Sequence, residues 1–474
     1  MSAYFTILPS AQELGRFSLS LLNSTIFAPH RRTVFNHPSL AEFDIDGESG
    51  FFPRDPLPSL PRPFDIWEAA LNETTERVSL GEDESDTAIE KRTSSEAWRR
   101  TIKSWPVIET DVLHTDPRLL QKAHQVLAWL VHFYVHSIPP SIRDASITVP
   151  KSIAVPLVAV SRVLGIAPVL TFADTVLWNC EPMDKSCPIS LENIRPKYTF
   201  SDTDDERSFY IASARAEIRG IEILRIIDAF HSLPNMSDFT SISRVSRDLA
   251  RLTKAIEDIS ENIQSVRADC DPHVFYWEIR PWFEGSDAKG PQEPGWVYEG
   301  VDMSEKLDLS GPSAGQSTVM HALDIFLGID HKLQYRRSPA PSPENKRADR
   351  GFMARMRRYM PGKHREFLEY LAAAPRQLRD QAQETTALKE PYDAAIMALK
   401  KLRDMHMRIA CLYIVTMSRS VPSDRPGCPV LAAMERQRGR APEDGPIRGT
   451  GGTELSLLLK AGRDATRRAA LKGN

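Results

Sequence analysis

The chain has 474 residues, a formal net charge of −3 at pH 7 and 41% hydrophobic residues, with an isoelectric point near 6.5. This length predicts two or more domains with a sizeable core, and the near-balanced charge argues against nucleic acid or an anionic membrane as the main partner. The five cysteines are scattered and form no C-x-x-C pair, which disfavours a disulfide framework and favours a reducing, cytoplasmic compartment.

The N-terminal part of the chain is rich in loop signals. Pro9, Glu13 and Arg16 interrupt it before a long apolar run develops, so no secretory signal is expected. Nowhere do about 18 uninterrupted apolar residues occur, so we expect a soluble protein. Residues 51–63 are typical of extended, proline-stiffened chain, and the charged residues 81–95 predict a solvated insertion.

Apolar residues at helical spacing predict the main elements. Asp116-Pro117 supplies an N-cap and a first-turn proline for one helix, and a second is expected to begin at Val155-Pro156 and to end at Gly165. Strand-like alternation is confined to 297–298. Further helices are expected over 207–232, 237–266, 314–327, 363–373 and 388–417.

These elements predict a mainly α fold in two domains. The first, over 1–200, is a small and partly irregular α domain, and the second, over 201–474, is a large helical domain. Two polar interruptions, 336–350 and 421–452, lack periodicity. The second is rich in Pro, Arg and Gly, and because a loop of that length in a compact domain is often functional, we expect a lid there.

His406 lies on the apolar stripe of the helix over 388–417, four residues after Leu402 and three before Ile409. A buried histidine most often donates to a backbone carbonyl within the core. It can also hold a haem iron from one side, while the apolar wall keeps the cavity dry. The residues alone leave both interpretations open.

Two further segments are unlike generic helix. Residues 310–317 (SGPSAGQS) are small, which permits close backbone approach to a flat ligand; the alternative is an ordinary loop with a helix cap. In residues 275–282 (FYWEIRPW), Arg280 stands among aromatic side chains. It is suited to binding a carboxylate bidentately, or else packs its stem on a surface cluster of rings.

Two more segments carry weaker signals. Phe209 and Ser213 share a helix face, where core packing with an internally satisfied hydroxyl is the default. The fourth segment is 152–157 (SIAVPL), which runs on to Phe172 and Asp174. His132 and His136, at i and i+4, have a spacing that suits zinc, but no third ligand follows, so no metal role is expected.

Several motifs follow one another in an order specific to one family. They are PKSIAVPL (150–157), LGI (164–166), Ala173-Asp174, SAGQS (313–317), MRRYMP (356–361) and GTGGT (449–453). From about Phe51 to near the C-terminus the chain resembles indoleamine 2,3-dioxygenase, the family of monomeric haem enzymes that open the indole ring of tryptophan. Insertions around 81–95, 333–350 and 421–447 diverge from the family.

The resemblance implies a two-domain, all-helical haem dioxygenase fold in which the small N-terminal domain covers the distal side of the haem. The cofactor would be haem b, ferrous in the active state, with His406 as the ligand of the iron. Arg403 matches a residue that contacts a haem propionate. Ser313, Ala314 and Gly315 match the loop along the haem.

On the distal side, the resemblance implies a catalytic set of Ser213, Phe275 and Arg280, with Arg280 binding the substrate carboxylate. The substrate-binding set that it implies is Phe172, Phe209, Phe275, Arg280, Ser313, Ala314, Gly315 and Thr450. Phe172 stands where mammalian members carry a tyrosine, Thr175 replaces a cysteine and Pro312 a glycine. These changes alter the fit of the substrate.

The implied reaction inserts both atoms of O2 across the indole C2–C3 bond of L-tryptophan and yields N-formylkynurenine, the first step of the kynurenine pathway of tryptophan catabolism and of NAD biosynthesis. The partners would be L-tryptophan and O2, the chain a monomer. Other hypotheses remain: a haem-binding sensor without turnover, a dioxygenase for a different indole, and a helical interaction protein that has lost haem. The retained His406, Arg403 and Arg280 argue against the last.

Overall fold

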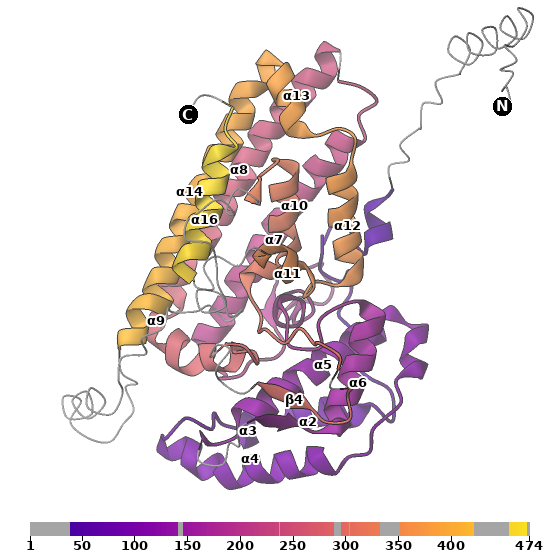
Figure 1. The fold of residues 1–474 in the computed structure, drawn as a ribbon, viewed down its shortest axis with the longest axis vertical. Helices are drawn as coiled ribbons and strands as arrows, with labels where there is room; N and C mark the ends of the chain where they lie inside the picture. Colours follow the sequence, from indigo (N-terminus) through magenta and orange to yellow (C-terminus); the bar gives the residue numbers. More distant parts are fainter. Residues whose placement is uncertain are drawn as a thin grey trace, which may run out of the picture. The chain divides into compact units, whose positions relative to one another are not determined.

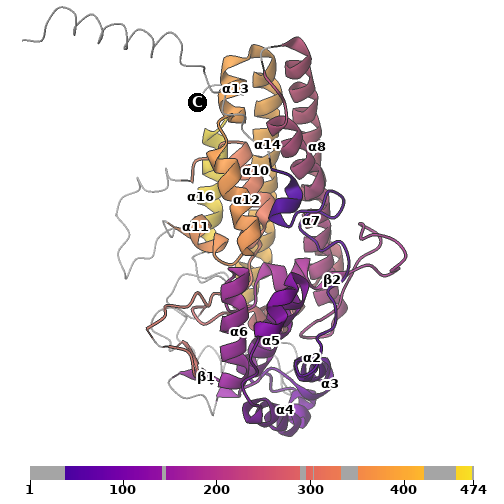
Figure 2. The same ribbon diagram turned by 90° about the vertical axis from the view of Figure 1, so that its right-hand side faces the viewer.

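The computed structural model describes residues 38–140, 146–236, 238–288, 295–302, 304–331, 351–420 and 455–471, with side chains from residue 458 in the last range. From Leu40 onward the chain forms one compact unit, drawn in Figures 1 and 2. The predicted mainly α class is confirmed. Within the described ranges, β structure is limited to two small sheets, in which β1 (Ile147–Val149) pairs in parallel with β4 (Trp296–Tyr298) and β2 (Cys180–Glu181) pairs antiparallel with β3 (Arg195–Pro196).

The α-helices have the following bounds. They are α2 (Asp65–Asn72), α3 (Thr74–Arg77), α4 (Asp86–Ser104), α5 (Pro117–His136), α6 (Lys151–Leu164), α7 (Asp204–His231), α8 (Phe239–Asp269), α9 (Pro272–Val274), α10 (Thr318–Phe326), α11 (Phe352–Arg357), α12 (Gly362–Ala373), α13 (Leu378–Glu384), α14 (Thr386–Ala410) and α16 (Leu455–Arg468). Short 3-10 or π-helical turns are η1 (Leu40–Phe43), η2 (Asp111–Thr115), η4 (Ala173–Leu177), η5 (Phe275–Ile279), η6 (Arg280–Phe283), η7 (Ala314–Gln316), η9 (Cys411–Thr416) and η10 (Met417–Arg419).

The N-terminal part is more helical than predicted. Residues 81–95, expected to be a solvated insertion, are mostly exposed, but from Asp86 onward they belong to α4. The N-cap of this helix is Ser85, whose Oγ accepts the N–H of Ala88. The pattern was misleading because α4 buries little of its length. Its large buried side chains, Trp98 and Ile102, come only near its end.

Helix α6 begins earlier than expected, at Lys151 rather than at Val155-Pro156. Proline lacks an N–H, which favours the first turn of a helix, but Pro156 lies inside α6. The Ser152 hydroxyl, which donates to the carbonyl of Ile102 at 2.6 Å, fixes the first turn on α4. The predicted end at Gly165 is confirmed, since this glycine has a left-handed φ of 64°.

Three long helices, α7, α8 and α14, lie side by side, with α16 against α14 (Figures 1 and 2). The prediction of one helix over 314–327 is corrected: η7 is followed by a separate helix, α10, because the Ser317 side chain caps the N–H of Met320 and starts a new helix. Residues 336–350 and 421–452, the predicted loops, lie outside the described residues.

Two large apolar clusters fill the unit. One gathers around α7, α8, α10, α12 and α14, and the other around α2, α4, α5 and α6 together with η5 and η6. The expected domain boundary near residue 200 stays a prediction.

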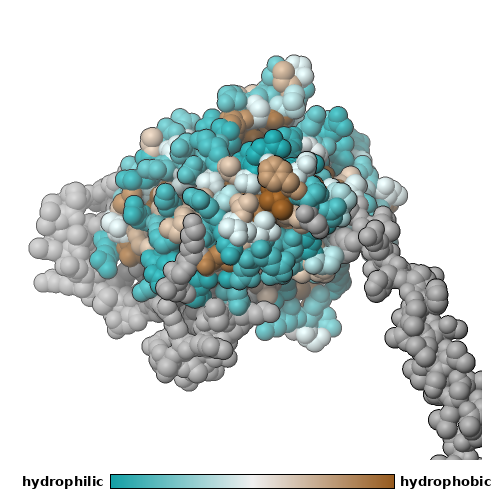
Figure 3. Space-filling model, turned by 90° about the horizontal axis from the view of Figure 1, so that it is seen from above, coloured by the Kyte–Doolittle hydropathy of each residue, from teal (hydrophilic) through white to brown (hydrophobic). Residues whose placement is uncertain are grey.

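In the described part of the chain, no helix combines the length and the apolar character that crossing a bilayer requires. Figure 3 shows one face of the molecule, on which hydrophilic residues predominate and hydrophobic ones are scattered.

Candidate functional site

His406 lies in the last two turns of α14 and is half-buried. Among the described residues, its imidazole makes no hydrogen bond. Burial, and then the nearby Arg403, lower the pKa of His406 below its ordinary value. The ring is therefore neutral at pH 7 and has a nitrogen lone pair to offer, which is the state that a metal ligand requires.

Four other histidines of this chain contact backbone carbonyls, whereas Nδ1 of the buried His364, like the ring of His406, has no hydrogen-bond partner among the described residues. A ring nitrogen of His124 contacts the Ala167 carbonyl at 3.1 Å, and one of His132 contacts the Trp282 carbonyl at 2.7 Å. His136 and His321 likewise contact backbone carbonyls, each through Nε2. These rings have the core role that was the alternative for His406, whereas His406 lacks such a carbonyl in the described structure.

Arg403, one turn before His406, ties α14 to two other elements. Its Nη2 lies 2.6 Å from both carboxylate oxygens of Asp324 on α10, and its Nη1 bonds to Thr466 Oγ1 and to the Gly462 carbonyl of α16. Burial by itself would raise the pKa of Asp324, but Arg403 and His331 together more than offset it and hold that pKa below its usual range. The position of α14 thus depends on this buried ion pair.

The small-residue loop before α10 crosses a second candidate segment at very close range. A Cβ on Gly311 would lie 1.8 Å from the Phe283 carbonyl oxygen, and one on Gly285 would lie 2.3 Å from the Gly311 nitrogen. Only glycine permits two backbones to approach so closely. The crossing places Ser313–Gly315 next to the segment that carries Arg280.

Gln316 joins this loop to Phe172. Its side-chain oxygen accepts the Phe172 N–H at 2.8 Å, and its amide nitrogen donates to the Gly311 carbonyl at 2.9 Å. Asp174 holds the same turn from the other side, because its carboxylate accepts both the N–H and the hydroxyl of Thr171. Phe172 is thereby fixed at the edge of the loop.

Aromatic side chains form a wall beside these segments. The ring of Phe209 lies 4.8 Å from that of Phe275 and 5.9 Å from that of Phe283. Phe275 in turn meets Tyr413, two turns beyond His406, at 5.6 Å. The wall therefore reaches from α7 to η9, which follows directly after α14.

Ser213 lies one turn after Phe209 on α7 and is half-buried. Its hydroxyl donates to the carbonyl of Phe209 at 3.2 Å, which is the internally satisfied state expected by default. The side chain still keeps acceptor lone pairs, since a hydroxyl has two.

Arg280 follows directly after η5 and begins η6. Its Nη1 donates to Glu284 Oε1 at 2.7 Å, and its guanidinium lies over the Tyr276 ring, 5.3 Å from the centroid. The Arg280 side chain is 12% exposed and that of Glu284 is 20% exposed. Sequence reasoning found the arginine and missed its carboxylate partner, although the i, i+4 spacing signals it.

Glu217 is a second buried carboxyl that sequence reasoning missed. It lies one turn after Ser213 on α7 and accepts a hydrogen bond from Ser317 Oγ at 2.5 Å. Its other oxygen, Oε2, has no partner among the described residues. Burial raises the pKa of Glu217 to about 7, and the Ser317 bond offsets only part of that rise. Its spacing from Ser213 was the available signal.

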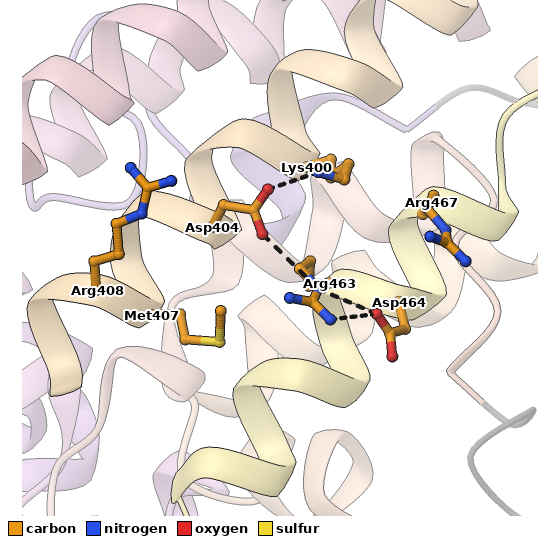
Figure 4. A pocket seen from close by; sticks show the side chains of 7 residues that line it. All are labelled: Lys400, Asp404, Met407, Arg408, Arg463, Asp464 and Arg467. Carbon is orange, nitrogen blue, oxygen red and sulfur yellow. Dashed lines mark hydrogen bonds and ion pairs between the residues drawn. The ribbon is translucent and has the colours of Figure 1, made fainter. Parts of the chain in front are cut away.

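A cavity of about 390 Å³ opens between α14 and α16, beside the His406 turn (Figure 4). Its lining is charged: Asp404 pairs with Lys400 at 2.6 Å and with Arg463 at 3.8 Å, and Arg463 also pairs with Asp464. This lining is unlike the mainly apolar wall that encloses a porphyrin or an indole.

The structure thus relates most of the predicted site residues to one another. Contacts connect the elements that carry Phe172, Phe209, Ser213, Phe275, Arg280, Ser313, Ala314, Gly315, Arg403 and His406. Thr450 lies outside the described residues. Asp324 was not foreseen, since no local pattern signals a partner 79 residues from Arg403.

Comparison with known proteins agrees across nearly the whole chain. Residues 39–469 match the family model described as "Indoleamine 2,3-dioxygenase". The chain is 28% identical to the mouse protein "Indoleamine 2,3-dioxygenase 1", over 91% of this chain and 96% of that one. It is 31% identical to "Indoleamine 2,3-dioxygenase" of Saccharomyces cerevisiae, over 78% and 82%. It is also 27% identical to "6-hydroxytryptophan 2,3-dioxygenase" of Fusarium equiseti, over 90% and 96%.

Proposed function

The chain belongs to the indoleamine 2,3-dioxygenase family, an oxidoreductase family that uses haem, and on that premise we propose that it converts L-tryptophan and O2 to N-formylkynurenine. The observation that carries the proposal is His406, a neutral imidazole without a hydrogen-bond partner in the described structure. It lies on α14, which Arg403 and Asp324 tie to α10, the helix that follows the small-residue loop. Helix α14 leads into η9, whose Tyr413 contacts Phe275 of the aromatic wall.

The residues present fit a haem. His406 would hold the iron, while Ser313, Ala314 and Gly315 would lie along the macrocycle and Arg403 would approach a propionate. The observation that supports this fit is the neutral ring of His406, which has no hydrogen-bond partner among the described residues. When bound, the haem would supply the activation of O2 that amino-acid side chains lack.

The chain's own contribution is binding, orientation and exclusion of water. Arg280 would bind the substrate carboxylate through charge-assisted hydrogen bonds. Phe172, Phe209 and Phe275 would hold the indole plane against the reacting oxygen, a proximity effect. Ser213 would offer a hydroxyl on the distal side, and Thr450 would close over the amino-acid end of the substrate.

A different indole is the second candidate. The Fusarium relative is named for 6-hydroxytryptophan, and Phe172 lies at the edge of the small-residue loop with no hydroxyl of its own. The two candidates share His406, Arg280 and the aromatic wall, so they differ only in the ring substituent that the wall accepts. Turnover of both substrates in parallel separates them.

The test is product formation by haem-loaded, reduced protein in air. We expect N-formylkynurenine from L-tryptophan with the parent and none with His406→Ala, whose haem Soret band should also be lost. His114→Ala, at an exposed position, is the matched control and should retain both. A parent with a haem spectrum but without product from either substrate would contradict the dioxygenase and favour a haem-binding sensor.

A further inference from the structure

The arginine proposed to receive the substrate carboxylate already has a carboxylate partner. Glu284 Oε1 lies 2.7 Å from Arg280 Nη1, and both side chains are mostly buried, with 20% and 12% exposed. A charge pair in this environment is weakly screened and interacts strongly with any further charge brought beside it. Glu284 is therefore part of the electrostatic environment that the polar end of a substrate meets.

The backbone of Glu284 is rigidly placed. His136 Nε2 contacts its carbonyl oxygen at 2.8 Å, and the residues on either side of it, Phe283 and Gly285, make the close crossing with Gly311. Phe283 also packs on Phe209 of the aromatic wall. Glu284 thus lies where the aromatic wall, the small-residue loop and Arg280 meet.

A lone arginine and an arginine–glutamate pair favour different ligands. A lone guanidinium attracts any carboxylate. The arginine–glutamate pair has no net charge. Its arginine attracts an anion, while its glutamate repels the same anion. An α-amino acid brings both an ammonium and a carboxylate, borne on the same carbon, and so complements both members. Specificity then arises from a repulsive element together with an attractive one.

We propose that Glu284 receives the α-ammonium group of the substrate while Arg280 receives its carboxylate, so that the pair selects zwitterionic indole α-amino acids. Indole acids without an amino group and indole amines without a carboxylate are disfavoured. This inference rests on the proposed function, because it takes Arg280 as the residue that meets the carboxylate.

A purely structural role of the pair makes a different prediction. An i, i+4 ion pair also stabilises the helical turn that contains it, and loss of that support would weaken all ligands alike. A third possibility is that Glu284 competes with the substrate for Arg280, in which case its neutralisation would strengthen binding of L-tryptophan. The three roles differ in the sign of the effect on each ligand.

The experiment measures equilibrium binding of L-tryptophan, tryptamine and indole-3-propionate to the haem-loaded protein by dialysis, for the parent and for Glu284→Gln. We expect the variant to bind L-tryptophan and tryptamine about 10- to 100-fold more weakly, the usual effect of losing a charge-assisted hydrogen bond. Indole-3-propionate should bind as tightly as before or more tightly, because the repelling charge is gone.

Two further variants serve as controls. Glu284→Asp keeps the charge and should recover part of the selectivity. Glu181→Gln makes the same chemical change in another carboxylate–arginine pair, since Glu181 lies 2.7 Å from Arg195, and should leave all three affinities unchanged. Circular dichroism and the Soret band report whether each variant folds and loads haem. If Glu284→Gln does not, the role of Glu284 is decided by comparing the affinities of the parent with those of Glu284→Asp.

Equal weakening of all three ligands, or tighter binding of L-tryptophan, in Glu284→Gln would overturn the inference. The inference would also be overturned if Glu284→Asp bound the three ligands with the same affinities as Glu284→Gln. Turnover of L-tryptophan by the parent, measured separately, tests the proposed function. A parent that binds selectively but makes no product would contradict the dioxygenase and leave the role of Glu284 in binding intact.

Discussion

His406 and Glu217 have ring or carboxyl atoms without a hydrogen-bond partner among the described residues. His406 keeps a neutral ring with no described hydrogen bond, and Glu217 has a carboxyl oxygen, Oε2, with no described partner. Buried polar groups are normally satisfied, so the Oε2 of Glu217 marks a place where the fold accepts a cost in stability. The two residues lie on the long helices that carry the proposed site, α14 and α7.

Glu217 should make stability depend on pH. Its pKa is about 7 in the folded protein and ordinary, near 4.5, in the unfolded chain, so the folded state binds the extra proton between these values. The stabilisation is complete below about pH 4.5 and is lost as the pH rises to about 7. Glu217→Gln removes this effect. Between pH 4.5 and 8, the free energy of unfolding of the variant should therefore rise by about 3 kcal/mol relative to that of the parent.

The measurement for Glu217 is denaturant unfolding of parent and variant across that pH range. Ser317→Ala serves as a second variant, because loss of its hydrogen bond should move the transition to higher pH. A difference between Glu217→Gln and the parent that stays constant with pH would show that Glu217 does not titrate in this window.

At the scale of elements, the site depends on two long-range connections. One is the backbone crossing of Gly285 and Gly311, and the other is the ion pair of Arg403 and Asp324 that links α14 to α10. Neither involves residues close in sequence. Each can be broken by one substitution with a matched control elsewhere.

Gly311→Ala should disrupt the crossing. Its Cβ would lie 1.8 Å from the Phe283 carbonyl oxygen, and backbone rather than a mobile side chain would have to move. We expect a loss of about 2–4 kcal/mol in the free energy of unfolding, within the range for severe packing strain. Gly47→Ala, whose Cβ would meet nothing within 4 Å, should change it by less than about 1 kcal/mol. Equal effects in thermal unfolding would contradict the crossing.

Asp324→Ala should leave the Arg403 guanidinium without its carboxylate at a side chain that is only 15% exposed. Breaking a buried pair on one side typically costs about 3–5 kcal/mol, and we also expect weaker haem retention, because α14 loses its tie to α10. The control is Glu222→Ala, which removes one of the two carboxylate partners of the more exposed Arg251 and should cost about 1 kcal/mol or less. Chemical unfolding and haem transfer to apomyoglobin measure the two effects.

At the scale of the whole molecule, several histidines are buried in the neutral state. Burial lowers the pKa of His132 and of His321 to about 4 and that of His364 to about 3. Each lies near 6.5 in the unfolded chain. Folding therefore requires these rings to remain deprotonated in mild acid.

The protein should lose stability as the pH falls from about 6.5 to about 4. In that window the unfolded histidines bind protons that the folded ones do not, so stability rises with pH. At pH 5.5 the three rings take up nearly three protons on unfolding, and Glu217 releases nearly one, leaving about two for the four groups together. The slope of the unfolding free energy against pH measures this uptake of protons. His364→Asn removes one of the titrating rings, so the number of protons obtained from the slope should fall by nearly one.

The sequence by itself determined the mainly α class, the start of α5, the approximate bounds of α7, α8, α12 and α14, and the end of α6 at Gly165. Periodicity, caps and left-handed glycines act over a few residues and are visible locally. The same local reasoning failed for α4 and for the start of α6, where packing on other elements outweighs weak amphipathicity and a proline.

Only the tertiary structure decided which of the candidate residues meet. The loop at Gly311 crosses Gly285, Gln316 holds Phe172 from 144 residues away, and Arg403 pairs with Asp324. These contacts join segments whose approach is dictated by how several helices pack together, and no single stretch of sequence contains that information. The residue type of His406 determines that it can act as a ligand of a metal. The lack of a hydrogen bond to its ring among the described residues depends on which neighbours the fold places beside it.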